Sequence, residues 1–428
     1  MSRLRGKIRA SLPPSSPNDS PVSDSTASDH GRLTKPLIVL SFDALATAAI
    51  GCYGSSWNQT PAIDTIATGG CVWDRWIATN DDSAAVLRRW FDGGDNSWAD
   101  AWRGSGAVDL ITDDSSIAAD AKCFDRVTTL PPQATQQDAQ PADEIETTQL
   151  ASVIAAAVER DAEDEPWSVM WLHSNFLSTR WDAPRSLFPI DEIELLAHEA
   201  DEEEVELIGN TEPARLVEPT LPIFETVTVP KLSLADSSDP DLVTSWMRTY
   251  GCQVRLIDLM IEILLQSISA DDPQLIVVGT GGFSLGQNGW IGRGCGPLRS
   301  PEIRVPMIIS DIGPIRMPQP SSDVAMTDIL RDLSCGASPW ASPKAWAARP
   351  SDVEIKTVSD RVEMAATTSS WFFVRDQDAS EHLFLKPDDV EDFNDVGRLR
   401  LDVIDDFNGA NTEDNSNNDD DKKETSPI

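Results

Sequence analysis

The chain has 428 residues, and its 71 aspartates and glutamates outnumber its 34 lysines and arginines, which gives a formal net charge of −37. This charge argues against nucleic-acid binding and against binding to anionic membrane surfaces, because both require clustered lysine and arginine side chains. The net charge does not exclude a metal site or a buried anion site, because the local charge of one pocket can differ from the net charge of the chain.

The two ends of the chain predict disordered tails. Residues 1–35 are rich in Ser, Pro, Asp and Arg, and residues 409–428 are rich in Asn and Asp. Neither segment has apolar periodicity. No apolar stretch follows the basic residues near the N-terminus, which argues against a signal peptide and predicts a cytoplasmic protein. The six cysteines show no CxxC spacing, so we expect free thiols rather than a zinc site or a disulfide scaffold.

Short apolar runs at 37–42, 167–172, 275–278 and 305–309 predict strands. Runs of this length that do not alternate with polar residues are typical of parallel strands buried on both faces. Helical spacing separates them, most clearly at 241–269, where apolar residues recur every three or four positions. Strands that alternate with helices predict an α/β three-layer sandwich with a mostly parallel central sheet. The uncharged stretches at 44–63 and 275–292 are broken by polar residues and Gly, so we expect no membrane span.

The remaining segments complete the predicted domain organisation. Residues 131–146 predict a surface loop, and residues 191–206, with an acidic run at 201–204, predict either a solvated helix or an insertion loop. Residues 371–374 and 382–385 predict two paired strands. We therefore expect a tail at 1–35, an α/β domain at 36–345, a small antiparallel subdomain at 346–408 and a tail at 409–428.

Ligands of parallel sheets bind beyond the carboxyl ends of the strands. The residues that directly follow the four runs are Asp43, 173–175, 280–284 and 310–311. We expect a functional site among these positions.

Three groups of motifs resemble the sulfatases of the alkaline-phosphatase superfamily, in the same order along the chain. The first is IVLSFDAL at 38–45, followed by IGCYG at 50–54 and TPAID at 60–64. The second is YGCQVRLID at 250–258, LIVV at 275–278, SLG at 284–286 and IRVPMII at 303–309. The third is HLFLKPDD at 382–389 with NDV at 394–396. The resemblance covers roughly residues 36–400 and implies the sulfatase fold and, by family, sulfuric ester hydrolysis.

The resemblance also assigns metal-ligand positions. In the family a calcium-like cation is held by several carboxylate and amide oxygens. Asp43 matches the first ligand, Ala44 stands where many members have a second Asp, and Thr280 and Gly281 stand at a further ligand pair. One carboxylate and one hydroxyl form a poor cage, so we expect no cofactor, or calcium if the family site persists. Asp43 also fits a purely structural role, capping the turn after its strand.

The nucleophile segment departs from the family pattern. An ungapped count from IAT at 77–79 places Ser83 at the Cys or Ser that the family oxidises to formylglycine. The residues that follow lack the family's Pro, and Arg88 arrives one residue late, so we do not expect formylglycine. A plain Ser nucleophile would still require metal activation. The alternative is an N-cap or loop hydroxyl before a helix that starts at Ala84.

The positions that hold the sulfate also differ. Ser178 stands where the family has a histidine, and His173, five residues earlier, fits a structural role as readily as a catalytic one. Cys295 stands at the position of the family's lysine. Arg293 offers a nearby cation, or else a solvated surface residue.

Two functions remain open. The favoured one is a divergent sulfatase-fold protein that no longer hydrolyses esters. It would have a binding or structural role in the cleft where the family binds its substrate, which we call the old cleft. The reason is that the metal, nucleophile and sulfate positions are altered together. The alternative is an active sulfuric or phosphoric ester hydrolase with a rearranged site of Asp43, Ser83, Arg88, Thr280 and Arg293. Either reading predicts that these side chains, Arg88 aside, converge on one cleft. The expected partner is a sulfated or phosphorylated small molecule or glycan, and the sequence identifies no protein partner.

Overall fold

The computed structural model describes residues 35–92, 97–131, 140–189, 223–235, 238–337 and 354–409. The predicted tails, apart from residues 35 and 409, lie outside these ranges, as do the acidic segment 191–206 and the predicted domain boundary at 345–346. Part of the predicted loop at 131–146 is also outside them.

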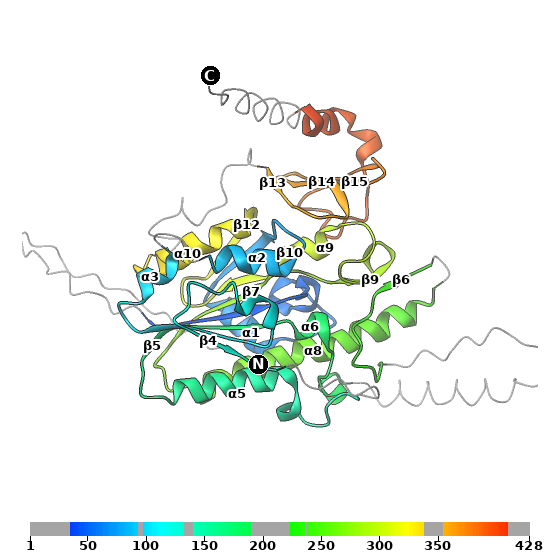
Figure 1. The fold of residues 1–428 in the computed structure, drawn as a ribbon. Helices are drawn as coiled ribbons and strands as arrows, with labels where there is room; N and C mark the ends of the chain where they lie inside the picture. Colours follow the sequence, from blue (N-terminus) through cyan, green and yellow to red (C-terminus); the bar gives the residue numbers. More distant parts are fainter. Residues whose placement is uncertain are drawn as a thin grey trace, which may run out of the picture. The chain divides into compact units, whose positions relative to one another are not determined.

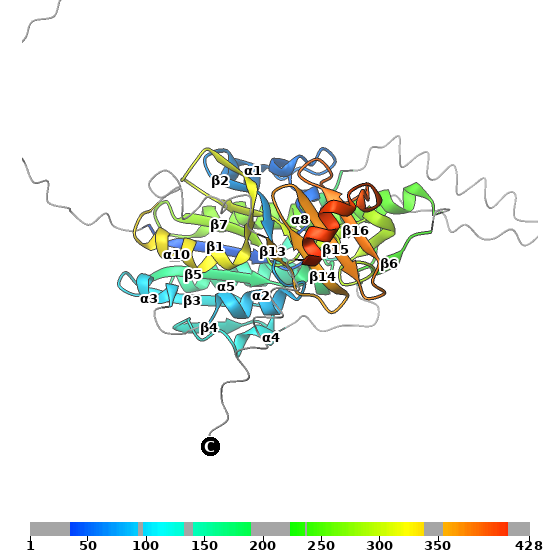
Figure 2. The same ribbon diagram turned by 90° about the horizontal axis from the view of Figure 1, so that it is seen from above.

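A sheet of nine strands within these ranges organises the fold (Figures 1 and 2). Its order is β10-β2-β11-β7-β1-β5-β3-β4, and β12 pairs with β2. β1 is parallel to its neighbours β5 and β7, and β3 is parallel to β4 and β5. The mostly parallel sheet confirms the predicted fold class. The strands are β1 (Leu37–Phe42), β2 (Cys71–Ile77), β3 (Ala107–Thr112), β4 (Arg126–Thr129), β5 (Trp167–Ser174), β7 (Gln274–Gly279), β10 (Arg304–Val305), β11 (Met307–Ile309) and β12 (Ile315–Ser322).

The fourth apolar run departs from the prediction. Pro306 separates β10 from β11, and β11 runs antiparallel to β7. Ser310 therefore lies beside the start of β7, where its N–H donates to the Leu275 carbonyl at 2.9 Å and its Oγ accepts from the Leu275 N–H at 2.8 Å. Residues 310–311 are thus at the edge opposite the carboxyl ends of the parallel strands, and the expectation that they share the ligand-binding edge was wrong.

Helices cover both faces of the sheet (Figure 1). One face packs against α1 (Pro61–Thr68), α5 (Gln149–Asp161) and α8 (Pro240–Ser267), and the other against α2 (Ser83–Trp90), α3 (Trp98–Trp102), α4 (Ser115–Ala118) and α10 (Met326–Ser334). Successive strand residues point to opposite faces. Ile38 and Leu40 accordingly join one core, and Leu37 and Val39 join the other. This burial on both faces explains why the run does not alternate. α8 confirms the helix predicted at 241–269.

A separate antiparallel sheet follows near the C-terminus. It consists of β13 (Ile355–Lys356), β14 (Val362–Thr367), β15 (Trp371–Asp376) and β16 (Glu381–Leu385), in that order. β15 and β16 confirm the predicted strand pair. Phe372 and Phe384 of this sheet share a buried cluster with Ile77 of β2 and with Ile303. The C-terminal sheet therefore packs directly on the edge of the main sheet.

The smaller elements are a three-stranded sheet and short helices. The sheet joins β6 (Leu232–Ser233), β9 (Trp290–Gly292) and β8 (Ser284–Leu285). Short α-helices are α6 (Phe176–Thr179) and α9 (Ser300–Ile303), and short 3-10 helices occur at Thr47–Ala49, Gly51–Tyr53, Ile145–Thr147, Arg185–Leu187, Gln287–Gly289, Asp323–Ala325 and Gly397–Leu399. A further helical segment spans 401–409. No helix in the described part of the chain has the length and apolar character that a bilayer crossing requires.

Residues of three motifs, IGCYG, TPAID and YGCQVRLID, contact one another around the loop after β1. The N–H of Cys52 donates to Asp64 Oδ1 at 2.6 Å. A Cβ at Gly51 would lie 2.2 Å from Asp64 Oδ2, so a larger residue there would displace the Asp64 carboxylate. Asp258 of α8 accepts from two backbone N–H groups in the first turn of α1, and burial raises its pKa to about 6. These residues fix α1 and the loop that follows Asp43.

Candidate functional site

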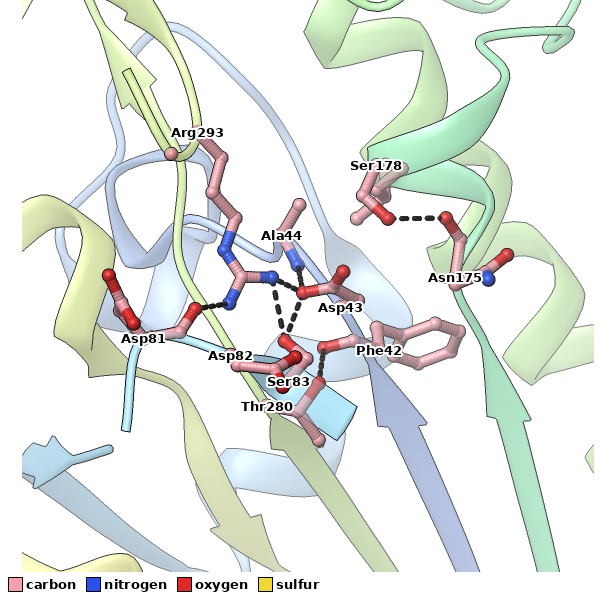
Figure 3. Close-up of polar contacts among 12 residues, drawn as sticks. Phe42, Asp43, Ala44, Asp81, Asp82, Ser83, Asn175, Ser178, Thr280 and Arg293 are labelled. Carbon is pink, nitrogen blue, oxygen red and sulfur yellow. Dashed lines mark hydrogen bonds and ion pairs between the residues drawn. The ribbon is translucent and has the colours of Figure 1, made fainter. Parts of the chain in front are cut away.

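The candidate site lies where β1, β7 and β9 end and α2 begins (Figure 3). Asp43 directly follows β1, Thr280 follows β7 and Arg293 follows β9. Ser83 is the first residue of α2. Asp82, rather than Ser83, caps this helix, because its Oδ1 accepts from the Ala84 N–H at 3.0 Å. The Ser83 hydroxyl is therefore not used as the cap.

One nitrogen of Arg293 contacts both Asp43 and Ser83 (Figure 3). Nη1 forms an ion pair with Asp43 Oδ1 and donates to Ser83 Oγ at 2.6 Å, while Nη2 donates to the Asp81 carbonyl at 2.6 Å. The Ser83 hydroxyl donates to Asp43 Oδ1, and the Ala44 N–H donates to the same oxygen at 2.7 Å. The side chains of Arg293 and Asp43 are only 12% and 13% exposed. Burial lowers the pKa of Arg293 to about 10, which leaves it charged at neutral pH.

Gly281 makes room for this guanidinium. A Cβ at Gly281 would lie 2.2 Å from Arg293 Cζ. The Gly281 carbonyl accepts from the Leu45 N–H at 2.8 Å, which joins the segments that follow β1 and β7. The resemblance places a metal ligand at position 281. Arg293 therefore fills the space in which the side chain of such a ligand would begin.

Thr280 and Arg88 have other partners. Thr280 is fully buried, and its hydroxyl donates to the Phe42 carbonyl at 3.3 Å, which places it next to Asp43 along β1. Arg88 donates from Nε to Asp120 at 2.9 Å, lies 3.8 Å from Asp82 and is 46% exposed. The structure thus joins Asp43, Ser83 and Arg293 in one network, with Thr280 at its border and Arg88 in ion pairs outside it.

The other singled-out residues lie in local contacts. His173 is fully buried in β5, with Nδ1 2.9 Å from Ser41 Oγ. Burial lowers its pKa to about 4, so the ring is neutral at pH 7. Ser178 Oγ donates to the Asn175 carbonyl at 2.8 Å. Cys295 Sγ lies 4.0 Å from the Ile291 carbonyl, and burial raises the pKa of the thiol.

A second ion-pair group supports the network, and sequence reasoning missed it. Arg361, in the turn before β14, donates to the two oxygens of Glu302 at 3.0 Å each and from Nε to Asp81 Oδ2 at 3.1 Å. Glu302 also accepts from the Gly294 N–H at 2.8 Å, one residue after Arg293. The C-terminal sheet therefore holds both loops that meet at Arg293. Glu302 directly precedes the IRVPMII motif, and a carboxylate that is buried requires a partner. The sequence does not identify Arg361 as that partner.

The side chains of this site are a poor fit for a calcium ion. Calcium takes about six to eight oxygen ligands. Asp43 Oδ1 is engaged by a guanidinium, a hydroxyl and an N–H, Gly281 offers no side chain, and the Thr280 hydroxyl donates to a carbonyl. The charge of Arg293 would also repel a divalent cation. Across the ranges that the structure describes, no three His, Cys, Asp or Glu side chains form a cluster suited to a metal.

Comparison with known proteins gives matches among solved structures. No protein-family model matches the sequence, and no curated protein matches it. BT4656, solved in complex with its substrate D-glucosamine-2-N,6-O-disulfate, superimposes with a TM-score of 0.63 at 15% identity, over 91% of this chain and 100% of that one. A putative sulfatase from Bacteroides thetaiotaomicron VPI-5482 gives 0.60 at 9% identity, over 92% and 94%.

A third match extends beyond sulfatases. The phosphonate monoester hydrolase of Agrobacterium radiobacter superimposes with a TM-score of 0.57 at 14% identity, over 89% of this chain and 96% of that one. At such identities the similarity establishes the fold. The chain has a sulfatase-like fold, as the motifs predicted.

Proposed function

We propose that this chain is a sulfatase-fold protein that does not hydrolyse esters, and that Arg293 takes the place of the metal ion in its old cleft. The proposal depends on one observation. A single guanidinium nitrogen contacts both Asp43, at the position of the first metal ligand, and Ser83, at the position of the nucleophile.

The charges of the network support a structural role for the cleft. Ester hydrolysis needs an activated nucleophile and cationic groups that stabilise the developing negative charge. The ion pair with Asp43 offsets the charge of Arg293, which leaves little of it to hold a sulfate group. The same contacts join the end of β1, the start of α2 and the loop after β9, so they stabilise the fold at the point where the family binds substrate.

One observation favours a second candidate, metal-independent hydrolysis of a sulfate or phosphate monoester. The Ser83 hydroxyl donates to Asp43, so the carboxylate can accept its proton as Oγ bonds to the sulfur or phosphorus atom and the bond to the ester oxygen breaks. The leaving alcohol takes up that proton, and water then hydrolyses the ester formed on Ser83 and restores its hydroxyl. BT4656 binds a disulfated glucosamine, and a sulfated sugar is the corresponding substrate class here.

Hydrolysis assays separate the two candidates. The full chain is incubated with an aryl sulfate and with an aryl phosphate, each with and without calcium. We expect no turnover above the rates of the Asp43→Ala and Ser83→Ala variants. Ser178→Ala is the matched control, because it removes a serine hydroxyl outside the network. Turnover that Ser83→Ala abolishes and Ser178→Ala retains would overturn the proposal in favour of the hydrolase.

A further inference from the structure

A pocket separate from the candidate site lies where the C-terminal sheet packs against the edge of the main sheet. Its volume is about 270 Å³, and its lining includes four cations from four segments: Arg75 of β2, Arg304 of β10, Arg316 of β12 and Lys386 directly after β16. Tyr53 adds an aromatic wall. The lining does not include Asp43, Ser83 or Arg293 of the candidate site. Asp74 is the one carboxylate among the described residues of the lining, so this pocket has a local excess of positive charge in a chain of net charge −37.

Two of the four cations are neutralised by carboxylates. Arg316 forms an ion pair with Asp74, and Lys386 forms one with the buried Asp392. Among the residues that the structure describes, Arg75 and Arg304 form no ion pair within 4.0 Å.

The hydrogen bonds of Arg75 and Arg304 position these two groups without cancelling their charge. Arg75, only 6% exposed, donates to the carbonyls of Thr368 and Ser369 at 2.8 and 2.7 Å. Arg304 donates to the Asp74 carbonyl at 2.8 Å and to Thr47 Oγ1 at 3.0 Å.

The electrostatics of the pair are unfavourable without a ligand. Burial, and then the charge of Arg304, lowers the pKa of Arg75 to about 10. The negative charges of Asp74 and Glu391 raise the pKa of Arg304, and that of Asp392 raises the pKa of Arg75, but burial outweighs them at both groups. Buried charges in proteins are normally paired, because desolvation without a partner is costly. Two close guanidinium groups facing one pocket therefore leave a charge imbalance that an anion would correct.

We propose that this pocket binds a tetrahedral oxyanion, the sulfate or phosphate group of a small monoester. Guanidinium groups suit such anions because their planar N–H donors match two oxygens at once. The pocket volume is well above the roughly 10–15 Å³ of cavity space that a single water molecule requires. This is enough for the anion and a small part of the group that carries it, with Tyr53 available to contact that group. The inference does not depend on the proposed function, since it uses no residue of the old cleft.

Calorimetric titration of the full chain with inorganic sulfate and with inorganic phosphate tests this inference, at an ionic strength held constant with chloride. We expect saturable binding of at least one anion, and the tighter of the two identifies the ester class. Arg304→Gln should weaken it at least tenfold, and Arg304→Lys should weaken it less. Arg316→Gln, a substitution at a side chain that is 51% exposed, should weaken it about threefold and serves if Arg304→Gln does not fold. Arg126→Gln is the matched control, because it removes one arginine from an exposed ion pair with Glu163.

Three results would overturn the inference. The first is the absence of saturable binding of either anion to the parent chain. The second is a loss in Arg126→Gln equal to that in Arg304→Gln and Arg316→Gln, which would show a response to net charge alone. The third is loss of binding in Ser83→Ala, which would place the anion in the old cleft.

Discussion

Removal of the Arg293 guanidinium should lower the free energy of unfolding substantially. Arg293→Met leaves the Asp43 carboxylate, 13% exposed, without its ionic partner and also removes donors to Ser83 and to the Asp81 carbonyl. Breaking a fully buried ion pair costs about 3–5 kcal/mol, whereas exposed pairs contribute about 0–1 kcal/mol. Because both side chains keep some exposure, we expect a loss of about 3 kcal/mol, roughly a hundredfold in the folding equilibrium.

A double-mutant cycle shows whether this cost comes from the unpaired charge. Asp43→Asn, introduced into Arg293→Met, leaves a neutral amide in place of the carboxylate and should recover about 1–2 kcal/mol. Urea unfolding at pH 7, followed by fluorescence of the 14 tryptophans, measures all four proteins. Arg126→Met, which breaks an exposed ion pair with Glu163, is the control and should change stability little.

The refuting results are specific. If Arg293→Met is no more destabilising than Arg126→Met, the network does not stabilise the fold. If the effects of Arg293→Met and Asp43→Asn on the free energy of unfolding simply add, the two side chains are not coupled. The proposal that Arg293 takes the place of the metal ion would then be wrong.

Three further outcomes follow from other contacts. His173 has a pKa of about 4 when folded and about 6.5 when unfolded. Its contribution to the free energy of unfolding should therefore fall by up to about 3 kcal/mol as the pH drops from 6.5 to 4, because the unfolded chain binds the proton more tightly. Urea unfolding of His173→Gln should show a correspondingly smaller drop over the same pH range. Arg361→Gln leaves Glu302, whose side chain is 3% exposed, without its bidentate partner; we expect a loss of about 2–4 kcal/mol in urea unfolding, and Arg361→Lys should recover only part of it. Gly281→Ala forces a Cβ to within 2.2 Å of the guanidinium and should cost about 1–3 kcal/mol in the same assay, whereas Gly104→Ala, with no atom within 4 Å of the added carbon, should cost less.

The sequence predicted the parts of the fold that depend on local pattern. The apolar runs correctly placed β1, β5 and β7, and the three- and four-residue spacing placed α8. The direction of β11 could not be predicted from its apolar run, because strands buried in parallel and antiparallel sheets have the same composition. Pro306, which ends β10, was the available sign that this run is not one strand.

The site was predictable only in part, for the same kind of reason. Asp43 followed from the strand-end rule, and Ser83 and Arg293 followed from counting along the family motifs. The meaning of Gly281 depended on the position of Arg293, which a loop brings to it from twelve residues away. Arg361, in the turn before β14, lies 59 residues from Glu302 in α9, so their pairing is a property of the tertiary structure.

Calorimetric titration of the full chain with calcium tests most directly the claim that Arg293 takes the place of a cation. With one carboxylate at the site, already paired to a guanidinium, we expect only heats of dilution, corresponding to no binding tighter than about 1 mM, the weak end of dedicated calcium sites. Asp43→Ala should give the same heats as the parent chain. Micromolar calcium affinity in the parent chain that is lost in Asp43→Ala would contradict the claim and restore the metal-dependent reading of the site.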